Sequence, residues 1–292
     1  MNKNTHFPDT NVLACVDLSP YAEHVADYAA WAAVRLAAPL ELLHVIDRHP
    51  ALQGEQDRSG ALLANAEENL LKSLSEQDAV RTRAERENAR AFLQALRERA
   101  FAAGASPVDT RQRHGDLQET LVEQQAGARL MVLGRRGASA DQAQSDLGSN
   151  VEWTVRAIKR PILAVTDRFK APERVLIAFD GSPITRKGVE MVAASALFKG
   201  LPVHVLMSGQ PKSDAPKQLE WARQTLVQSG FEVVASTVPG EPETVIDQTV
   251  LKEGIDLLIM GAYTHSPLRK LFFGSKTDAL LRAARVPTLL LR

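Results

Sequence analysis

Two sets of glycine, serine and aspartate residues have the types and spacing to bind a phosphate-bearing ligand. Glycines let the backbone approach a phosphate closely, and the N–H groups at a helix N-terminus attract its charge. A carboxylate facing them can accept ribose hydroxyls or help to hold Mg2+ that enters with a nucleotide. The first set is Asp17, Gly134-Arg135-Arg136-Gly137 and Gly148-Ser149-Asn150, and the second is Asp180, Gly261-Ala262-Tyr263-Thr264 and Gly274-Ser275-Lys276-Thr277. Glycine turns and capping serines also simply connect strands to helices, so the residue types alone leave both interpretations open.

Other kinds of site are not supported by the sequence. No G-x-x-x-x-G-K-[ST] loop and no G-x-G-x-x-G fingerprint is present, which argues against a Walker-type site and a standard dinucleotide site. The histidines form no H-E-x-x-H pair and Cys15 is the only cysteine, so we predict no metal centre built by the protein alone. Ser182 lacks the G-x-S-x-G turn of a nucleophilic serine, so we predict no catalytic residue. We interpret His44 and His204, in apolar runs, as hydrogen-bonded core histidines.

An internal repeat indicates which elements position the two sets. Five sequence blocks recur in the same order along the chain. They pair residues 11–20 with 174–183, 40–46 with 201–207, 129–134 with 255–261, 148–149 with 274–275, and 160–165 with 286–291. The repeat predicts two copies of one fold.

Each copy is predicted to be an α/β sheet. Runs rich in leucine and β-branched residues, such as 11–16, 40–46 and 129–133, are typical of buried parallel strands. The alanine-rich stretch 22–37 has helical spacing. Alternating strands and helices predict a parallel sheet with right-handed crossovers and helices on both faces. Ligands of such sheets bind beyond the carboxyl ends of the strands, where the strand order reverses.

The polar junction at residues 167–172 predicts two domains, 1–168 and 169–292. From Asp17 to Gly134 is 117 positions and from Asp180 to Gly261 is 81, so the first domain carries 36 extra residues. These fall around residues 51–90, a charged segment of helical composition. It is either a docking helix for a partner or a longer solvated surface helix.

Composition argues against several classes of partner. The chain has 292 residues, of which 45% are hydrophobic, and its 35 basic side chains balance 35 acidic ones. This balance predicts no nucleic-acid partner and no attraction to an anionic membrane. The apolar runs are shorter than the roughly 18 residues that span a bilayer, and the N-terminal residues lack the apolar core of a signal peptide. We therefore expect a cytoplasmic globular protein.

The pattern resembles the universal stress protein (UspA) family. In the second half, Met260-Gly261-Ala262-Tyr263-Thr264-His265 follows the family signature, with nine residues between Thr264 and Gly274-Ser275. In the first half, Leu42-Leu43-His44-Val45-Ile46-Asp47 and the Gly134-x-x-Gly137 turn match the same signature. The chain thus resembles a tandem universal stress protein with two such domains.

The resemblance implies a Rossmann-like (adenine nucleotide alpha-hydrolase-like) α/β fold with a five-stranded parallel sheet in each domain. It also implies ATP or AMP in the strand-end cleft, with Mg2+ only together with the nucleotide. Asp17 and Asp180 would face the ribose or adenine, and backbone groups of Val45 and Leu206 would contact the adenine. Phosphate would be surrounded by Gly134, Gly137, Gly148, Ser149 and Asn150 in the first half, and by Gly261, Gly274, Ser275, Lys276 and Thr277 in the second.

Both halves depart from the family pattern. Thr264 stands at the second glycine position, where a β-branched residue resists positive φ, although His265 follows it with favourable charge. In the first half the loop before Gly148 has ten residues and no basic side chain, and Arg135 and Arg136 would supply the missing charge. These departures leave open whether one, both or neither half binds nucleotide.

The resemblance implies a protein that binds adenine nucleotide and acts in the stress response through conformation and partner binding. The alternatives are a nucleotide-free scaffold with degenerate clefts, and a slow ATPase or autophosphorylating protein. Family members dimerise through their last strands, which predicts that residues 161–166 and 287–291 pair within this chain as a pseudo-dimer. A further homodimer and the identity of a protein partner are left open.

Overall fold

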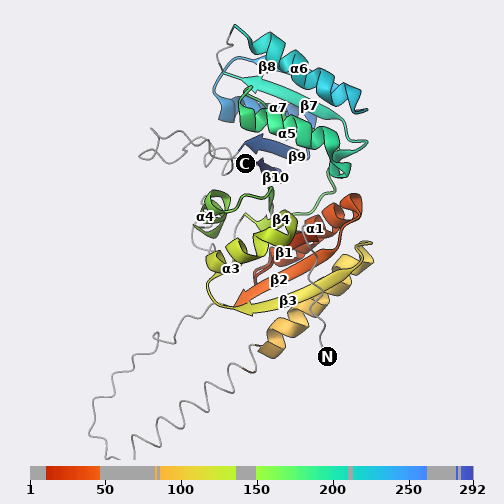
Figure 1. The fold of residues 1–292 in the computed structure, drawn as a ribbon, viewed down its shortest axis with the longest axis vertical. Helices are drawn as coiled ribbons and strands as arrows, with labels where there is room; N and C mark the ends of the chain where they lie inside the picture. Colours follow the sequence, from red (N-terminus) through yellow and green to blue (C-terminus); the bar gives the residue numbers. More distant parts are fainter. Residues whose placement is uncertain are drawn as a thin grey trace, which may run out of the picture.

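The computed structural model describes residues 11–46, 83, 86–135, 149–209, 213–261, 281 and 284–291, with the backbone alone for 149–152 (Figure 1). Within these ranges, no helix combines the length and apolarity needed to cross a bilayer.

The described strands form one ten-stranded sheet with the order β3-β2-β1-β4-β5-β10-β9-β6-β7-β8 (Figure 1). The first half contributes β1 (Asn11–Cys15), β2 (Leu40–Ile46), β3 (Val108–His114), β4 (Ala128–Gly134) and β5 (Ile162–Val165). The second half contributes β6 (Val175–Ala178), β7 (Val203–Ser208), β8 (Val233–Val238), β9 (Leu257–Gly261) and β10 (Thr288–Leu291). All pairs within a half are parallel. The halves meet where β5 and β10 pair antiparallel, with Ala164 opposite Thr288.

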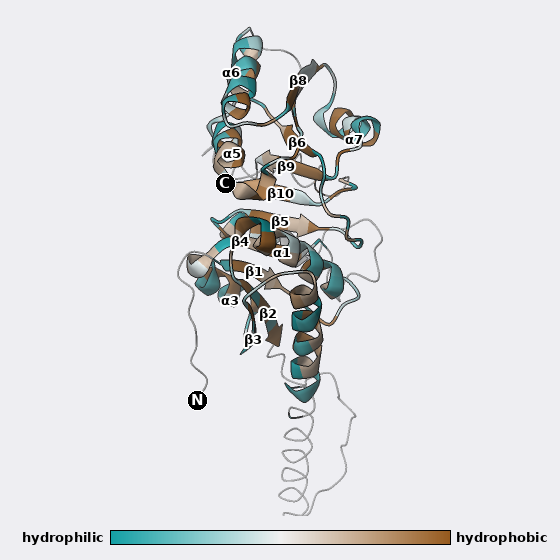
Figure 2. Cartoon of the chain, turned by 90° about the vertical axis from the view of Figure 1, so that its right-hand side faces the viewer, coloured by the Kyte–Doolittle hydropathy of each residue, from teal (hydrophilic) through white to brown (hydrophobic). Residues whose placement is uncertain are grey.

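Helices cover both faces of this sheet. One face carries α1 (Ala22–Leu36), the helix at 86–102, α5 (Pro183–Ala194) and α6 (Ala215–Gln228). The other carries α3 (Leu117–Gln124), α4 (Ser149–Ala157) and α7 (Pro242–Glu253). Figure 2 shows the hydrophobic strands inside and hydrophilic outer helices such as α6. This arrangement confirms the predicted Rossmann-like α/β fold.

The sequence explains why the helices pack closely on the sheet. In α1, Ala26, Ala29, Ala30 and Ala33 are all buried, and their small side chains bring the helix axis near the strands. In the helix at 86–102, buried residues recur at helical spacing and the intervening positions are mostly exposed. The buried positions are Ala89, Leu93, Leu96 and Ala100. Most of the extra segment at 51–90 lies outside the described residues.

β2 and β7 occupy equivalent places in the two halves, but their predicted alignment was wrong. Leu43 lies opposite Cys15 where β2 pairs with β1, and Leu206 lies opposite Ala178 where β7 pairs with β6. The carbonyls of Leu43 and Leu206 each accept a backbone hydrogen bond of 2.9 Å from the residue that follows β1 or β6. Leu206 is therefore the structural counterpart of Leu43.

The alignment of residues 40–46 with 201–207 is consequently two residues out of register, and the counterpart of Val45 is Ser208. Side chains along a strand alternate between the two faces with a period of two. A shift by two residues therefore leaves every inward and outward position unchanged, and the hydrophobic pattern does not reveal it.

The segment that joins the halves is fixed from both sides. Tyr28 of α1 donates its hydroxyl hydrogen to the Arg168 carbonyl at 3.0 Å, and its ring meets Phe169 edge-on with centroids 4.8 Å apart. On the side of the second half, the Asp256 carboxylate accepts a hydrogen bond from the Lys170 ammonium. The halves are thus joined by a held segment as well as by strand pairing.

Candidate functional site

The strand order reverses once in each half, between β1 and β4 and between β6 and β9. The carboxyl ends of these strands carry the predicted polar residues. Asp17 and Asp180 follow β1 and β6 at the second position, and Gly134 and Gly261 are the last residues of β4 and β9. Both predicted sets therefore begin at the place where α/β sheets bind ligands.

In each half, one carboxylate oxygen holds the turn that leads into the first helix. Oδ1 of Asp17 accepts hydrogen bonds from the Ser19 backbone N–H, at 3.1 Å, and from the Ser19 hydroxyl. Oδ1 of Asp180 accepts from the Ser182 backbone N–H at 2.9 Å and from the Thr185 hydroxyl at 2.7 Å. The two backbone contacts are Asx turns, so both aspartates shape the loops that follow β1 and β6.

Thr185 is a part of this turn that was not predicted from the sequence. Ser182 is the N-cap of α5 and accepts a hydrogen bond from the Thr185 backbone N–H at 3.4 Å. A serine at a helix N-cap with a threonine three residues later is the sequence pattern that could have predicted this contact. The corresponding position of the first half is Ala22, which has no hydroxyl.

The glycine that ends β9 is required by close packing. A Cβ atom added to Gly261 would lie 3.0 Å from Cγ2 of Ile184 and 3.5 Å from Cγ2 of Thr185. The strand therefore ends against the first turn of α5, and a side chain there would push the two elements apart. In the first half, Gly134 lies opposite Val165 of β5.

Arg135 does not act where the sequence analysis expected it. Its backbone N–H donates to the Val165 carbonyl at 3.0 Å, which extends the pairing of β4 with β5. Its guanidinium donates to the carbonyls of Leu281, at 3.1 Å, of Ala284, and of Val286, at 2.7 Å. These acceptors belong to the second half, ahead of β10. The side chain thus links the halves, and we no longer assign it to phosphate.

Val45 and Leu206, the two residues predicted from the sequence to contact adenine, differ in burial. Val45 is half-buried near the end of β2, whereas the Leu206 side chain is only 1% exposed and lies in the core. The Leu206 carbonyl already accepts a hydrogen bond from Phe179. Ser208, the half-buried counterpart of Val45, is the position at which β7 ends. The position equivalent to Val45 is therefore Ser208 and not Leu206.

Three buried titratable groups of the described strands are the Cys15 thiol and the side chains of His44 and His204. Nδ1 of His44 is 2.9 Å from the Val16 carbonyl, and Nε2 of His204 is 2.9 Å from the Ser236 hydroxyl, which confirms both as hydrogen-bonded core histidines. Burial lowers the pKa of His204. Burial of the Cys15 thiol, followed by the negative charge of nearby carboxylates, raises its pKa to about 12, so at neutral pH the weakly nucleophilic thiol form dominates.

A set of side chains from α6 covers the loop after β6. The Gln218 amide carbonyl accepts from Arg186 at 2.8 Å, its amide nitrogen donates to Asp214 at 3.1 Å, and its side chain is the nearest group to Gly181. The Arg186 guanidinium lies over the Trp221 ring, 4.0 Å from its centroid. No local sequence pattern predicts this group of side chains, because Arg186 comes from α5 and Gln218 and Trp221 come from α6.

α4 begins at Ser149, so Ser149 and Asn150 open a helix as the sequence predicted. Other predicted site residues lie outside the described part of the chain: Arg136, Gly137, Gly148, Thr264, His265, Gly274, Ser275, Lys276 and Thr277. In the part that is described, no group of three or more His, Cys, Asp or Glu residues could hold a metal ion.

These observations define an α/β protein of two Rossmann-like halves, each with an aspartate turn beside a glycine at its strand-order reversal. The model of the universal stress protein family matches residues 10–166 and again residues 172–292. The chain is 32% identical over 285 residues to Universal stress protein Slr1230 of Synechocystis sp., covering 97% of this chain and 99% of that protein. The chain belongs to the universal stress protein family.

Two further similarities support the same family and fold. Universal stress protein Rv2005c of Mycobacterium tuberculosis is 28% identical over 195 residues, which cover 59% of this chain and 65% of that protein. The crystal structure of a universal stress protein from Archaeoglobus fulgidus matches with a TM-score of 0.72 at 19% identity, covering 97% of this chain and 98% of that one. The fold is thus shared along nearly the whole chain.

Proposed function

We propose that this universal stress protein binds an adenine nucleotide, ATP or AMP, in its strand-end clefts. It would act in the stress response through conformation and partner binding. The observation that carries the proposal is the repeated pairing of an aspartate turn with a strand-ending glycine at both strand-order reversals, Asp17 with Gly134 and Asp180 with Gly261. Ligands of open α/β sheets bind at such places.

The roles within each cleft follow from position. Backbone groups at the ends of β2 and β7, at Val45 and Ser208, would contact the adenine, and the aspartate carboxylates would accept ribose hydroxyls. The N-terminus of α4 at Ser149 would attract phosphate in the first half. Gly274 and Ser275 would do the same in the second half. Mg2+ would enter only with the nucleotide.

The organisation that we propose is two domains, 1–168 and 169–292, joined as a pseudo-dimer in the cytoplasm. The antiparallel pairing of β5 with β10 supports it, because it places the last strands of the halves together within one chain. A partner protein would contact the charged segment around residues 51–90.

The test has two parts. Freshly purified protein is denatured and the released small molecules are separated by chromatography; the stripped protein is then titrated with ATP or AMP, with and without Mg2+, by calorimetry.

Variants Asp17→Asn and Asp180→Asn keep an Oδ1 acceptor for the turn and remove the charge. Each should weaken binding at its own cleft by about tenfold, the loss of one charge-assisted hydrogen bond. Glu123→Gln, at an exposed carboxylate near the C-terminal end of α3, is the matched control.

The outcomes separate the candidate functions. Binding of one or two equivalents, weakened by the cleft variants and not by Glu123→Gln, supports the proposal. No released nucleotide and no heat at millimolar ATP would reject it in favour of a nucleotide-free scaffold. Release of ADP over hours, or phosphate incorporated into the chain, would instead indicate a slow ATPase or autophosphorylation.

A further inference from the structure

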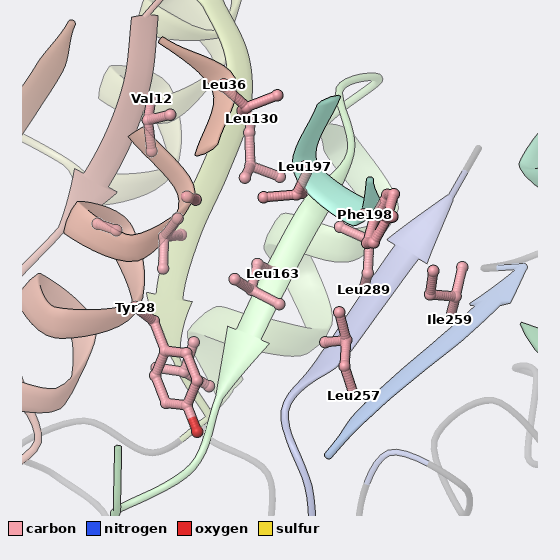
Figure 3. Close-up of a cluster of buried hydrophobic side chains, with 14 of the residues drawn as sticks. Val12, Tyr28, Leu36, Leu130, Leu163, Leu197, Phe198, Leu257, Ile259 and Leu289 are labelled. Carbon is pink, nitrogen blue, oxygen red and sulfur yellow. The ribbon is translucent and has the colours of Figure 1, made fainter. Parts of the chain in front are cut away.

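A separate cavity lies between the two halves, at the amino-terminal ends of β4 and β5. It is thus at the opposite end of these strands from the nucleotide clefts. Its volume is about 210 Å³. Its apolar walls come from α1, β4, α5, the short helix η3 (Ala196–Phe198) and β10. The lining includes Leu36, Leu130, Leu197, Phe198 and Leu289, which Figure 3 shows gathered around β4, β5 and β10.

The size and lining of this cavity suit a small hydrocarbon group. A buried apolar cavity of about 150 Å³ is large enough to hold benzene, and this cavity exceeds that volume. Because Leu36 and Leu130 come from the first half and Leu197, Phe198 and Leu289 from the second, the cavity exists only while the halves are packed together.

Two polar groups line the same cavity. Arg129 is exposed, and within the described residues it makes no hydrogen bond or ion pair. The Ser195 hydroxyl oxygen accepts from the Leu197 backbone N–H at 3.2 Å, and its own hydrogen remains a donor. A guanidinium and a hydroxyl beside an apolar cavity are a donor pair for an anionic oxygen.

The residues beside the lining add positive charge. Arg35, Arg160 and Lys199 each adjoin a lining residue in sequence, and Glu190 is the acidic residue that does so. Arg35 is held in place by donating to the Leu197 carbonyl, and Arg160 by donating to carbonyls of η1 (Gln125–Gly127). The local field therefore favours an anion.

We infer that this cavity binds an amphiphilic monocarboxylate with a medium-length hydrocarbon chain. The chain lies among the leucines and Phe198, and the carboxylate meets Arg129 and the Ser195 hydroxyl. Such a ligand would stabilise the packing of one half on the other, since both halves supply its walls. The inference does not depend on nucleotide binding.

The test titrates the full chain, free of nucleotide, with hexanoate, octanoate and decanoate, and with octanol as the uncharged probe. Affinity should rise about fourfold for each CH2 that becomes buried, until the cavity is filled. Arg129→Gln should weaken octanoate binding at least about threefold and leave octanol binding unchanged. Arg113→Gln, another exposed arginine without a partner among the described residues, is the matched control and should change neither.

A blocking variant locates the site. Ala194→Trp, at an exposed helical position of the cavity lining, should abolish saturable octanoate binding, whereas Ala196→Trp, an exposed alanine outside the lining, should not. No saturable binding of any of these carboxylates at millimolar concentration would overturn the inference. Unchanged octanoate binding in Ala194→Trp, or an equal loss of octanoate and octanol binding in Arg129→Gln, would also overturn it.

Discussion

Replacing Arg135 by alanine should lower the stability of the whole chain through the second half. The guanidinium donates to three carbonyls, of Leu281, Ala284 and Val286, that precede β10. Because β10 is the strand that pairs with β5, the loss of these bonds would loosen the segment that leads into the junction between the halves. The perturbation therefore tests whether the two halves stabilise each other.

The expected magnitude follows from these contacts. A hydrogen bond to a charged group contributes roughly 1.5–3 kcal/mol net. The three bonds share one guanidinium, which is half-buried, and water can reach part of the freed carbonyls, so their contributions do not add fully. We expect Arg135→Ala to lower the free energy of unfolding by about 2–4 kcal/mol. At roughly 2 °C per kcal/mol for a chain of this size, Tm should fall by about 4–8 °C.

Thermal unfolding followed by circular dichroism measures this loss, and amide hydrogen exchange locates it at residues 284–291. Arg135→Lys keeps the charge and loses the planar fork, so most of the loss should persist. Arg223→Ala, which removes an exposed ion pair with Glu220 on α6, is the control and should change Tm little. If Arg135→Ala lowers Tm no more than Arg223→Ala does, the Arg135 contacts do not stabilise the junction.

Three further predictions concern Cys15, His204 and Gly261. Because burial raises the pKa of Cys15 to about 12, native protein at pH 8 should react with iodoacetamide far more slowly than protein unfolded in urea; equal rates would contradict this placement. Burial lowers the pKa of His204 in the folded state, so its contribution to stability is present above the unfolded pKa of about 6.5 and is lost as pH falls below it. His204→Gln should flatten the loss of stability between pH 7 and pH 5, measured by urea unfolding, and an unchanged slope would reject this. Gly261→Val should destabilise by about 1–3 kcal/mol through overpacking against Ile184, and Ile184→Ala in the same chain should recover part of that loss; strictly additive losses would contradict the contact.

Much of the fold could be predicted because the sequence repeats a local pattern. The blocks that end at Gly134 and Gly261 were aligned correctly, because each glycine ends an apolar run and fixes the alignment at one position. The strands that contain Val45 and Leu206 have no such marker. Their alternating pattern fits equally well after a shift of two residues, and only the pairing with β1 and β6 distinguishes the two registers.

The role of Arg135 could not be predicted from its neighbours. In the sequence of the loop from Gly134 to Gly148, Arg135 and Arg136 are the basic residues, so either is expected to bind the nearest anion. Its carbonyl acceptors are about 150 residues further along the chain, on the other half. The direction of a long side chain at a strand end is decided by tertiary packing, which no local pattern encodes.

The contacts between the halves also distinguish this chain from a symmetric dimer. In a twofold dimer, every contact from one subunit to the other occurs twice. Here Arg35 and Arg135 of the first half donate to backbone carbonyls of the second. The position equivalent to Arg135 in the second half is Ala262, which has no side-chain donor. Ala262 therefore cannot make the reciprocal contact. A change in the loop after Gly134 can affect the second half through the Arg135 hydrogen bonds, and the side chain of Ala262 offers no equivalent hydrogen bonds to the first half. Nucleotide titrations should therefore be analysed with two non-identical sites, and Arg135→Lys should alter the second site through the chain ahead of β10 while it leaves the Asp17 turn in place.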